Sequence, residues 1–168
     1  KKATPEELNS IINHPVVQDL SSAISNMLHD VLTSHGPESW NNKLEKVGLL
    51  FDDEGKLGIH IPNPGADKSA ILINPFASIA KYADKKPVNA AQDIFQTIVH
   101  EIAHIPGGSH DDAWRTRYDE LLADYGDNDY AARTKIAQIL GTRGREDYNA
   151  GVGEILDKYL SIRGRESS

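Results

Sequence analysis

A helical stripe of apolar residues between positions 89 and 105 is the strongest structural signal in this 168-residue chain. Its apolar residues recur at intervals of three and four positions, as on one face of an α-helix. They are Ile94, Phe95, Ile98, Ile102 and Ile105. Asn89 is expected to cap the helix with Gln92 as its capping-box partner, and Pro106 with two following glycines is expected to end it.

Helical patterns also occupy both ends of the chain. Near the start, Thr4, Pro5 and Glu7 have the order of a capped helix start, and a second apolar stripe follows a break at His14–Pro15. After the central helix, the apolar spacing predicts three more helices, over residues 112–125, 130–140 and 146–162.

The middle of the chain has the pattern of short strands. Apolar runs or alternating apolar residues occupy residues 46–51, 56–61 and 70–73, and turn residues such as Asp, Asn, Gly and Pro separate them. We expect a small sheet that is at least partly antiparallel, with one edge near the proline-rich loop after residue 61. The order of helices, small sheet and helices predicts an α+β fold.

The composition is that of one globular domain covering residues 1–168. Hydrophobic residues make up 39% of the chain and charged residues 26%. Within the domain we distinguish N-terminal helices over 1–45, a core over 46–126 and C-terminal helices over 127–168. The net charge of −7 argues against a stand-alone nucleic-acid-binding protein. The absence of cysteine excludes disulfides and thiol catalysis, so a metal site would have to use His, Asp or Glu.

The chain has no apolar run near the roughly 18 to 20 residues that span a bilayer, so we expect no membrane contact. Its first residues lack the apolar stretch of a signal peptide. We expect a cytoplasmic location, with export after loss of an upstream signal left open. Because the chain starts with lysine, we also expect a processed form or a domain of a longer polypeptide.

The chemistry of the chain is concentrated in His100-Glu101-Ile102-Ala103-His104, an H-E-x-x-H pattern within the helical stripe. Residues four apart are separated by only about 40° around a helix, so both imidazoles point to one side and can hold one metal ion. Glu101 lies on the flank of that site, from where its carboxylate can reach a water molecule on the metal. Glu101 is therefore the candidate general base.

A catalytic zinc ion usually has three protein ligands and one water molecule. Glycine allows the chain to reverse direction after Pro106, and such a reversal can return His110 to the same ion. His110 is therefore the candidate third ligand. Nearby carboxylates compete for the position: Asp111, Asp112, Asp119, Glu120 and Asp124.

The string from His100 to Asp111 resembles the zincin metallopeptidases. Its H-E-x-x-H-x-x-G-x-x-H-D spacing is similar to that of metzincins, with Gly107 and His110 at the glycine and third-ligand positions. Met27 is the only methionine and lies upstream, so the downstream methionine turn of metzincins is absent. The residues from His110 to Trp114 are instead similar to the SprT-like minimal zincins. The resemblance covers residues 70 to 125.

The resemblance implies a zinc-dependent endopeptidase that hydrolyses peptide bonds with Zn²⁺ on three histidines and Glu101 as the base. It also implies a sheet packed on the active-site helix, and a protein or peptide substrate extended along an edge strand. We prefer residues 56–61 over 70–73 for that edge. The alternative is a zincin-like domain of a larger protein that binds a partner and has little or no peptidase activity. The acidic charge disfavours a DNA-linked protease.

Several other residues have a structural and a functional interpretation. Trp114 is expected in the core beside the active-site helix. Any of Tyr118, Tyr125 and Tyr130 can pack in the core or donate a hydrogen bond to the oxyanion of the reaction. Asp111 and Asp112 are expected to cap a helix. His60 is interpreted as a surface histidine of a strand, with the cleft as its other possible location. The remaining histidines, His14, His29 and His35, are interpreted as structural.

Overall fold

The computed structural model describes residues 3–35, 43–52, 55–63, 68–106, 110–125, 130–142 and 147–164. Within these ranges the chain forms seven helices and two small sheets, which confirms the α+β prediction. The helices are α1 (Pro5–Ile12), α2 (Pro15–His35), α4 (Pro75–Lys81), α5 (Pro87–Ile102), α6 (Asp112–Tyr125), α7 (Tyr130–Leu140) and α8 (Ala150–Gly164). The strands are β1 (Leu44–Leu49), β2 (Gly58–Asn63), β3 (Lys68–Ile73), β4 (Gly141–Thr142) and β5 (Asp147–Tyr148).

The larger sheet has the strand order β1-β3-β2 and is mixed. Strand β1 runs parallel to β3, whereas β2 runs antiparallel to it, from the pair Gly58–Ile73 to the pair Asn63–Lys68. The predicted partly antiparallel sheet is therefore confirmed. The alternative edge at residues 70–73 was wrong, because β3 is hydrogen-bonded to a strand on each side.

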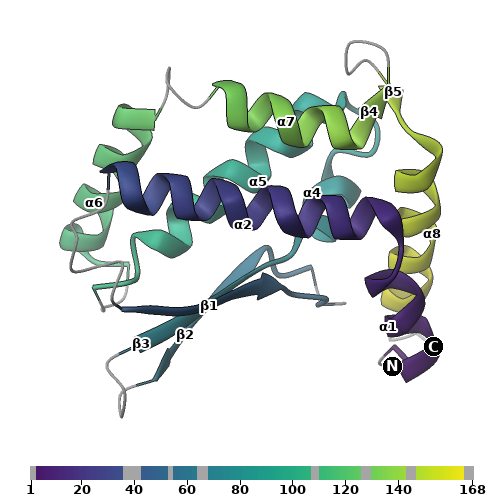
Figure 1. Ribbon diagram of the computed structural model, residues 1–168, viewed down its shortest axis with the longest axis horizontal. Coiled ribbons are helices and arrows are strands. Elements are labelled where there is room, and N and C mark those ends of the chain that lie inside the picture. The colour runs from purple at the N-terminus through teal and green to yellow at the C-terminus, as the bar shows by residue number, and fades with distance from the viewer. Residues whose placement is uncertain are drawn as a thin grey trace.

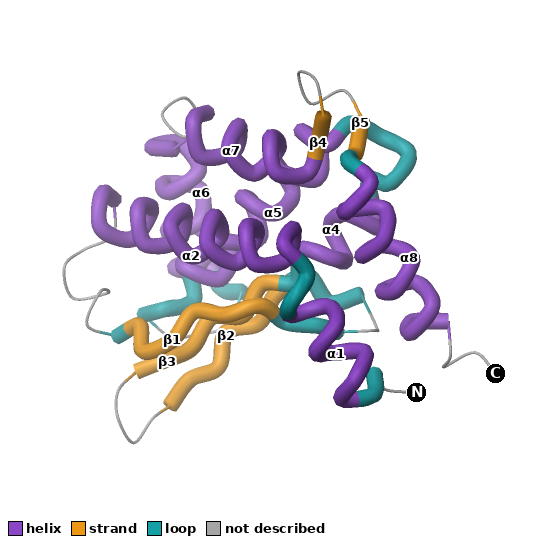
Figure 2. Tube along the Cα trace, turned by 45° about the vertical axis from the view of Figure 1, so that its right-hand side comes forward, coloured by secondary structure: helices purple, strands orange, loops and turns teal. Residues whose placement is uncertain are grey.

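Helices α2, α5 and α7 lie on one side of this sheet (Figures 1 and 2). On that side β3 presents Ile71 and Ile73, which are fully buried. The opposite face contains the partly buried Ile59 and Leu72, and Ile61 at its rim is 44% exposed. None of the helices in the described ranges has the length and apolar character needed to cross a membrane.

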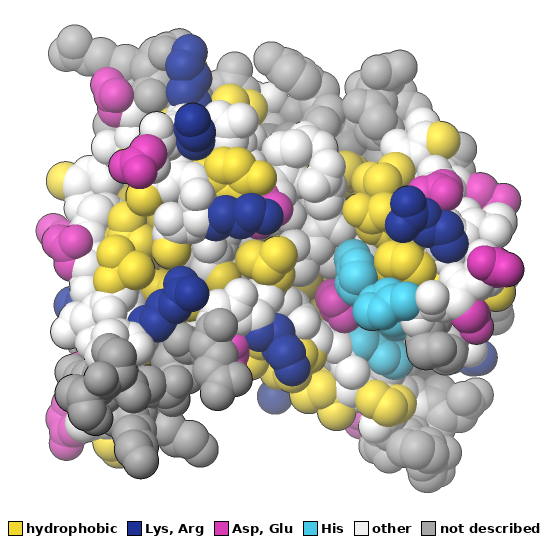
Figure 3. All heavy atoms as spheres, turned by 180° about the vertical axis from the view of Figure 1, so that it is seen from behind, with side chains coloured by type: hydrophobic (Ala, Val, Ile, Leu, Met, Phe, Trp, Pro, Cys, Tyr) yellow, Lys and Arg dark blue, Asp and Glu magenta, His cyan; other side chains and the backbone are white. Residues whose placement is uncertain are grey.

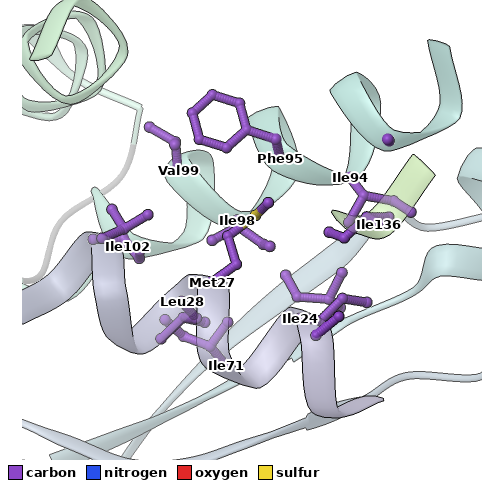
Figure 4. Close-up of a cluster of buried hydrophobic side chains, with 14 of the residues drawn as sticks. Ile24, Met27, Leu28, Ile71, Ile94, Phe95, Ile98, Val99, Ile102 and Ile136 are labelled. Carbon is purple, nitrogen blue, oxygen red and sulfur yellow. The ribbon is translucent and has the colours of Figure 1, made fainter. Parts of the chain in front are cut away.

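Helix α5 runs through the main core. Its residues Ile94, Ile98 and Ile102 have no exposed surface, and Figure 4 shows their side chains among residues from α2, α7 and β3. Complete burial of an isoleucine side chain stabilises a fold by roughly 1.5–3 kcal/mol. The apolar stripe in the sequence is thus the buried face of α5, as predicted. The core cluster also draws residues from each of the three parts that the sequence distinguishes, 1–45, 46–126 and 127–168.

A second buried cluster joins α1, α4 and α8. At its centre Phe76 and Tyr159 stack with ring centroids 6.0 Å apart, and the Tyr159 hydroxyl donates to the Asp52 carbonyl oxygen over 2.8 Å. Helix α4 is an element that the sequence analysis missed. Asn74 follows the predicted strand at residues 70–73 and caps this helix, since its side chain accepts from Ala77 N–H over 3.2 Å, and Pro75 is the first helical residue.

Both predicted boundaries of the central helix were wrong. Helix α5 starts at Pro87 after Lys86, rather than at Asn89, because proline is favourable at the first helical position. It ends at Ile102 in a series of turns, before the predicted stop at Pro106.

Helix α8 starts at Ala150 rather than at residue 146. Residues Asp147 and Tyr148 instead pair with Gly141–Thr142, and the Asn149 side chain then caps the helix by accepting from Val152 N–H over 3.0 Å. The predicted start of α1 is confirmed, since Thr4 and Glu7 form a reciprocal capping box.

Candidate metal centre

Three histidine side chains converge at the end of α5. His100 lies in the last turn of α5, His104 in the following turn and His110 just before α6. The Nε2 atom of His110 is 3.0 Å from that of His100 and 3.1 Å from that of His104. Figure 3 shows histidine side chains gathered in one patch of the surface. The sequence prediction that these three imidazoles meet is therefore realised in the fold.

The arrangement fits a metal ion. Around a tetrahedral zinc ion with bonds of about 2.0–2.1 Å, ligand nitrogens are about 3.3 Å apart, close to the separations found here. A neutral imidazole offers one N–H donor and one lone pair. Three Nε2 atoms that face one another are satisfied together when a cation accepts all three lone pairs. Imidazole donors suit zinc, and also cobalt, nickel and copper.

The electrostatic environment keeps the His100 imidazole available as a ligand. Burial, together with the neighbouring His104 and His110, lowers the pKa of His100 to about 4. At neutral pH the His100 ring is therefore uncharged, which is the form that binds a metal ion.

Glu101 lies beside the three histidines with its side chain only 7% exposed. Its Oε2 atom is 3.9 Å from His100 Nε2. Burial raises the pKa of Glu101 to about 7, and the positive charge of Lys56 opposes that rise. A carboxylate thus stands next to the imidazole cluster, on the flank where the sequence placed it.

Helix α6 packs against the histidines and holds the end of α5. The Trp114 ring lies 4.8 Å from the ring of His100 and 4.5 Å from that of His110, between centroids. Its Nε1–H donates to the His100 carbonyl oxygen over 3.3 Å, and Arg117 Nε–H donates to the Ala103 carbonyl oxygen over 2.9 Å. Trp114 is 6% exposed, which confirms the prediction that it lies in the core beside the helix.

His60 lies in the site and not on the outer surface of β2, so its default interpretation was wrong. Its ring stacks on that of His104, with centroids 6.0 Å apart and an interplanar angle of 20°. His60 Nε2 is buried without a hydrogen-bond partner. Burial and the adjacent His104 lower the pKa of His60, so the ring is neutral. The alternation of Ile59 and Ile61 had indicated a strand, but not which face of it meets α5.

A cavity of about 320 Å³ adjoins the histidine cluster. It lies between α5, the start of β2 and α6, and both His100 and Glu101 line it. Tyr118 lines it too, with its ring 5.2 Å from that of Trp114, so one of the three candidate tyrosines is near the site. Asp93 and Gly58 also line the cavity. The sequence analysis singled out neither, because no motif marks them.

Three of the five competing carboxylates have other environments. Asp111 caps α6, since its Oδ1 accepts from Trp114 N–H over 2.8 Å, as predicted. Asp119 lies 3.6 Å from Arg115, and Glu120 is exposed. Among the described side chains, the three histidines are the one group of three possible ligands within reach of a common ion. The side chains of Asp124, Tyr125, Tyr130 and His35, and the predicted glycine turn at 107–108, lie outside the described residues.

Comparisons of this chain with family models, with curated proteins and with solved structures found no match. The geometry of the site therefore carries the functional argument. That geometry supports a site able to hold a metal ion on His100, His104 and His110.

Proposed function

We propose that this protein is a zinc-dependent metallopeptidase with a zincin-like core that hydrolyses peptide bonds in proteins or peptides. One observation carries the proposal: three imidazole nitrogens meet beside a buried carboxylate, at the edge of a cavity. A purely structural metal site is normally closed by a fourth protein ligand, whereas a catalytic site leaves one position open.

In this proposal His100, His104 and His110 hold the ion, with Nε2 as the ligand atom of each. A zinc ion bound there would bring the pKa of a coordinated water towards about 7 and polarise a peptide carbonyl group. The partial exposure of the His100 side chain, 36%, leaves the cluster open to water and substrate.

Glu101 is the proposed general base. Its carboxylate lies beside His100 and faces the same cavity, so it is within reach of a water molecule at the histidine cluster. It would accept a proton from the attacking water and then transfer that proton to the leaving amine. Tyr118 of α6 is the proposed donor to the oxyanion, because it lines the cavity together with His100 and Glu101.

Strand β2 is the proposed platform for the peptide. It is an edge strand, since β3 pairs with one side of it and the sheet has the order β1-β3-β2 in the described part of the chain. An extended peptide can add to such an edge through backbone hydrogen bonds. The edge starts at Gly58, next to Glu101, so a peptide bound there passes the proposed catalytic groups.

The test compares the wild type with Glu101→Gln, each loaded with zinc, in the digestion of casein. We expect cleavage by the wild type that a chelator abolishes and zinc restores, and no cleavage by Glu101→Gln despite a full complement of zinc. The matched control is Glu120→Gln, which makes the same change at an exposed residue of α6. Cleavage by Glu101→Gln at the wild-type rate would contradict the assignment of the base. A zinc-loaded wild type without any activity would favour a zincin-like binding domain.

A further inference from the structure

The cavity beside the histidines contains a second carboxylate that the proposed chemistry does not use. Asp93 of α5 is 7% exposed and lines the cavity. One of its oxygens, Oδ1, is 3.5 Å from Lys81 Nζ. The other, Oδ2, is buried and has no hydrogen-bond partner. A buried carboxylate oxygen without a partner is costly, so this position favours a ligand that brings a positive charge or hydrogen-bond donors.

Asp93 lies along the same face of α5 as the proposed catalytic groups. Thr97 and Glu101 follow it at intervals of four residues, and all three line the cavity. His100 is seven positions after Asp93, which corresponds to about 10.5 Å along the helix axis. The cavity therefore extends from the histidine cluster towards an acidic group two helical turns away.

The dimensions of the cavity suit one long side chain. Its volume of about 320 Å³ is at the lower limit of small-molecule sites, which start near 300 Å³. Leu57 and the Thr97 methyl group offer apolar wall to an aliphatic stem. Five bonds of about 1.5 Å separate the Cα and Nζ of lysine, so its charge can lie roughly 6 Å from a backbone bound near the metal centre.

We propose that this cavity selects a lysine or arginine side chain next to the scissile bond, and that Asp93 receives its positive charge. The inference rests on the proposed peptidase function and names its substrate class. Asp93 is in this view a specificity-determining residue that takes no part in bond cleavage. Its Oδ1 lies near Lys81, whereas its buried Oδ2 has no hydrogen-bond partner, so the carboxylate can accept a further positive charge.

Substitution of Lys81 provides a second test of the same site. Its side chain is 55% exposed and reaches Asp93 from the end of α4, so its charge competes with that of a substrate. Removal of that charge by Lys81→Met should strengthen the selection of basic side chains, whereas Asp93→Asn should abolish it. These opposite directions separate the proposal from a purely structural role of the ion pair.

The test uses two peptides that differ only in lysine or its uncharged analogue norleucine at one position. Their dissociation constants are measured with zinc-loaded Glu101→Gln, in which no turnover is expected, and their kcat/KM values with the zinc-loaded enzyme. We expect a preference of about tenfold or more for lysine, loss of that preference with Asp93→Asn, and a larger preference with Lys81→Met. Asp157→Asn removes the same charge at an exposed position of α8 and should leave the preference for lysine unchanged.

The outcomes separate the two proposals. An Asp93-dependent preference in binding, without cleavage of any peptide, would uphold the site and contradict the peptidase. Cleavage without a preference for lysine, or with a preference that Asp93→Asn leaves intact, would overturn the inference and uphold the peptidase. If Asp93→Asn does not fold, Lys81→Met tests the inference by itself. An unchanged or smaller preference for lysine in Lys81→Met would also overturn the inference.

Discussion

Gly58, the first residue of β2, lies directly against Glu101 of α5. A Cβ atom on Gly58 would be 3.3 Å from Glu101 Cγ, 2.9 Å from Thr97 Cγ2 and 3.2 Å from the Leu72 carbonyl oxygen. The missing side chain therefore lets the edge strand approach the helix at the position of the proposed base. The contact fixes the distance between the proposed peptide platform and the proposed catalytic group.

Replacement of Gly58 by alanine should disturb this approach. Overpacking of a tight contact costs about 1–3 kcal/mol, and here one of the close atoms belongs to the backbone of β3 and cannot rotate away. We expect Gly58→Ala to lower the free energy of unfolding in urea by that amount and to reduce peptidase activity through displacement of Glu101.

Gly153→Ala is the matched control for this substitution. Gly153 lies within α8, and an added Cβ would meet no atom within 4 Å. Alanine is favoured over glycine in a helix interior by about 0.5–1 kcal/mol, so this variant should be more stable than the wild type. Equal stability of Gly58→Ala and the wild type would show that the strand does not need this close approach.

Zinc binding should depend on the third histidine, His110. His110 is exposed, so its replacement by alanine should change the stability of the metal-free protein by less than about 0.5 kcal/mol. In the wild type, zinc at a hundred times its dissociation constant should add about 2.7 kcal/mol to the free energy of unfolding. We expect His110→Ala to lose most of this gain in a thermal-shift titration with zinc.

His29→Ala, the removal of another exposed histidine, is the control and should keep the gain. A zinc-dependent shift of the same size in His110→Ala would mean that the ion is held without the third imidazole.

Trp114 should affect the metal site through its contacts with the three imidazole rings. Phenylalanine at this position keeps part of the ring packing but removes the hydrogen bond to the His100 carbonyl oxygen. Substitutions of groups that orient metal ligands commonly cost 10- to 100-fold in affinity. We expect Trp114→Phe to weaken zinc binding by roughly tenfold in a competition with a chromophoric chelator. Unchanged affinity would reduce Trp114 to a core residue.

The sequence predicted most of the histidine cluster because its signals are local. The spacing of His100 and His104 depends only on helix geometry, and the stripe that includes Ile98 defines the buried face on the other side of the same helix. His110 needed a chain reversal, for which proline and glycine are the usual signals.

The residues that the sequence analysis missed depend on contacts between distant segments. His60 meets His104 only because β2 turns that face towards α5, and alternation alone gives no direction. From the sequence alone, Asp93 is interpreted as a helix residue that is exposed to solvent. Its burial follows from the packing of α4 and α5, since Lys81 at the end of α4 reaches it. Asn74 followed by Pro75 is a favourable helix start, yet no helix was predicted between the strand at 70–73 and the helix from Asn89.

Tyr148 should make stability depend on alkaline pH. Its hydroxyl donates to the Tyr82 carbonyl oxygen over 2.8 Å, and burial raises its pKa from the usual 10 to about 12. Between these values the unfolded chain releases the proton while the folded chain retains it. The contribution of Tyr148 to stability is therefore complete below pH 10 and is lost as the pH rises towards 12.

The difference in unfolding free energy between the wild type and Tyr148→Phe isolates this residue from the other tyrosines. Near pH 8 the wild type should be more stable by about 0.5–1.5 kcal/mol, the usual net contribution of one hydrogen bond. Urea titrations at successive pH values should show this difference shrinking above pH 10, because only the wild type loses the contribution. A difference that stays constant to pH 12 would mean that the Tyr148 hydroxyl ionises equally well in the folded and the unfolded chain.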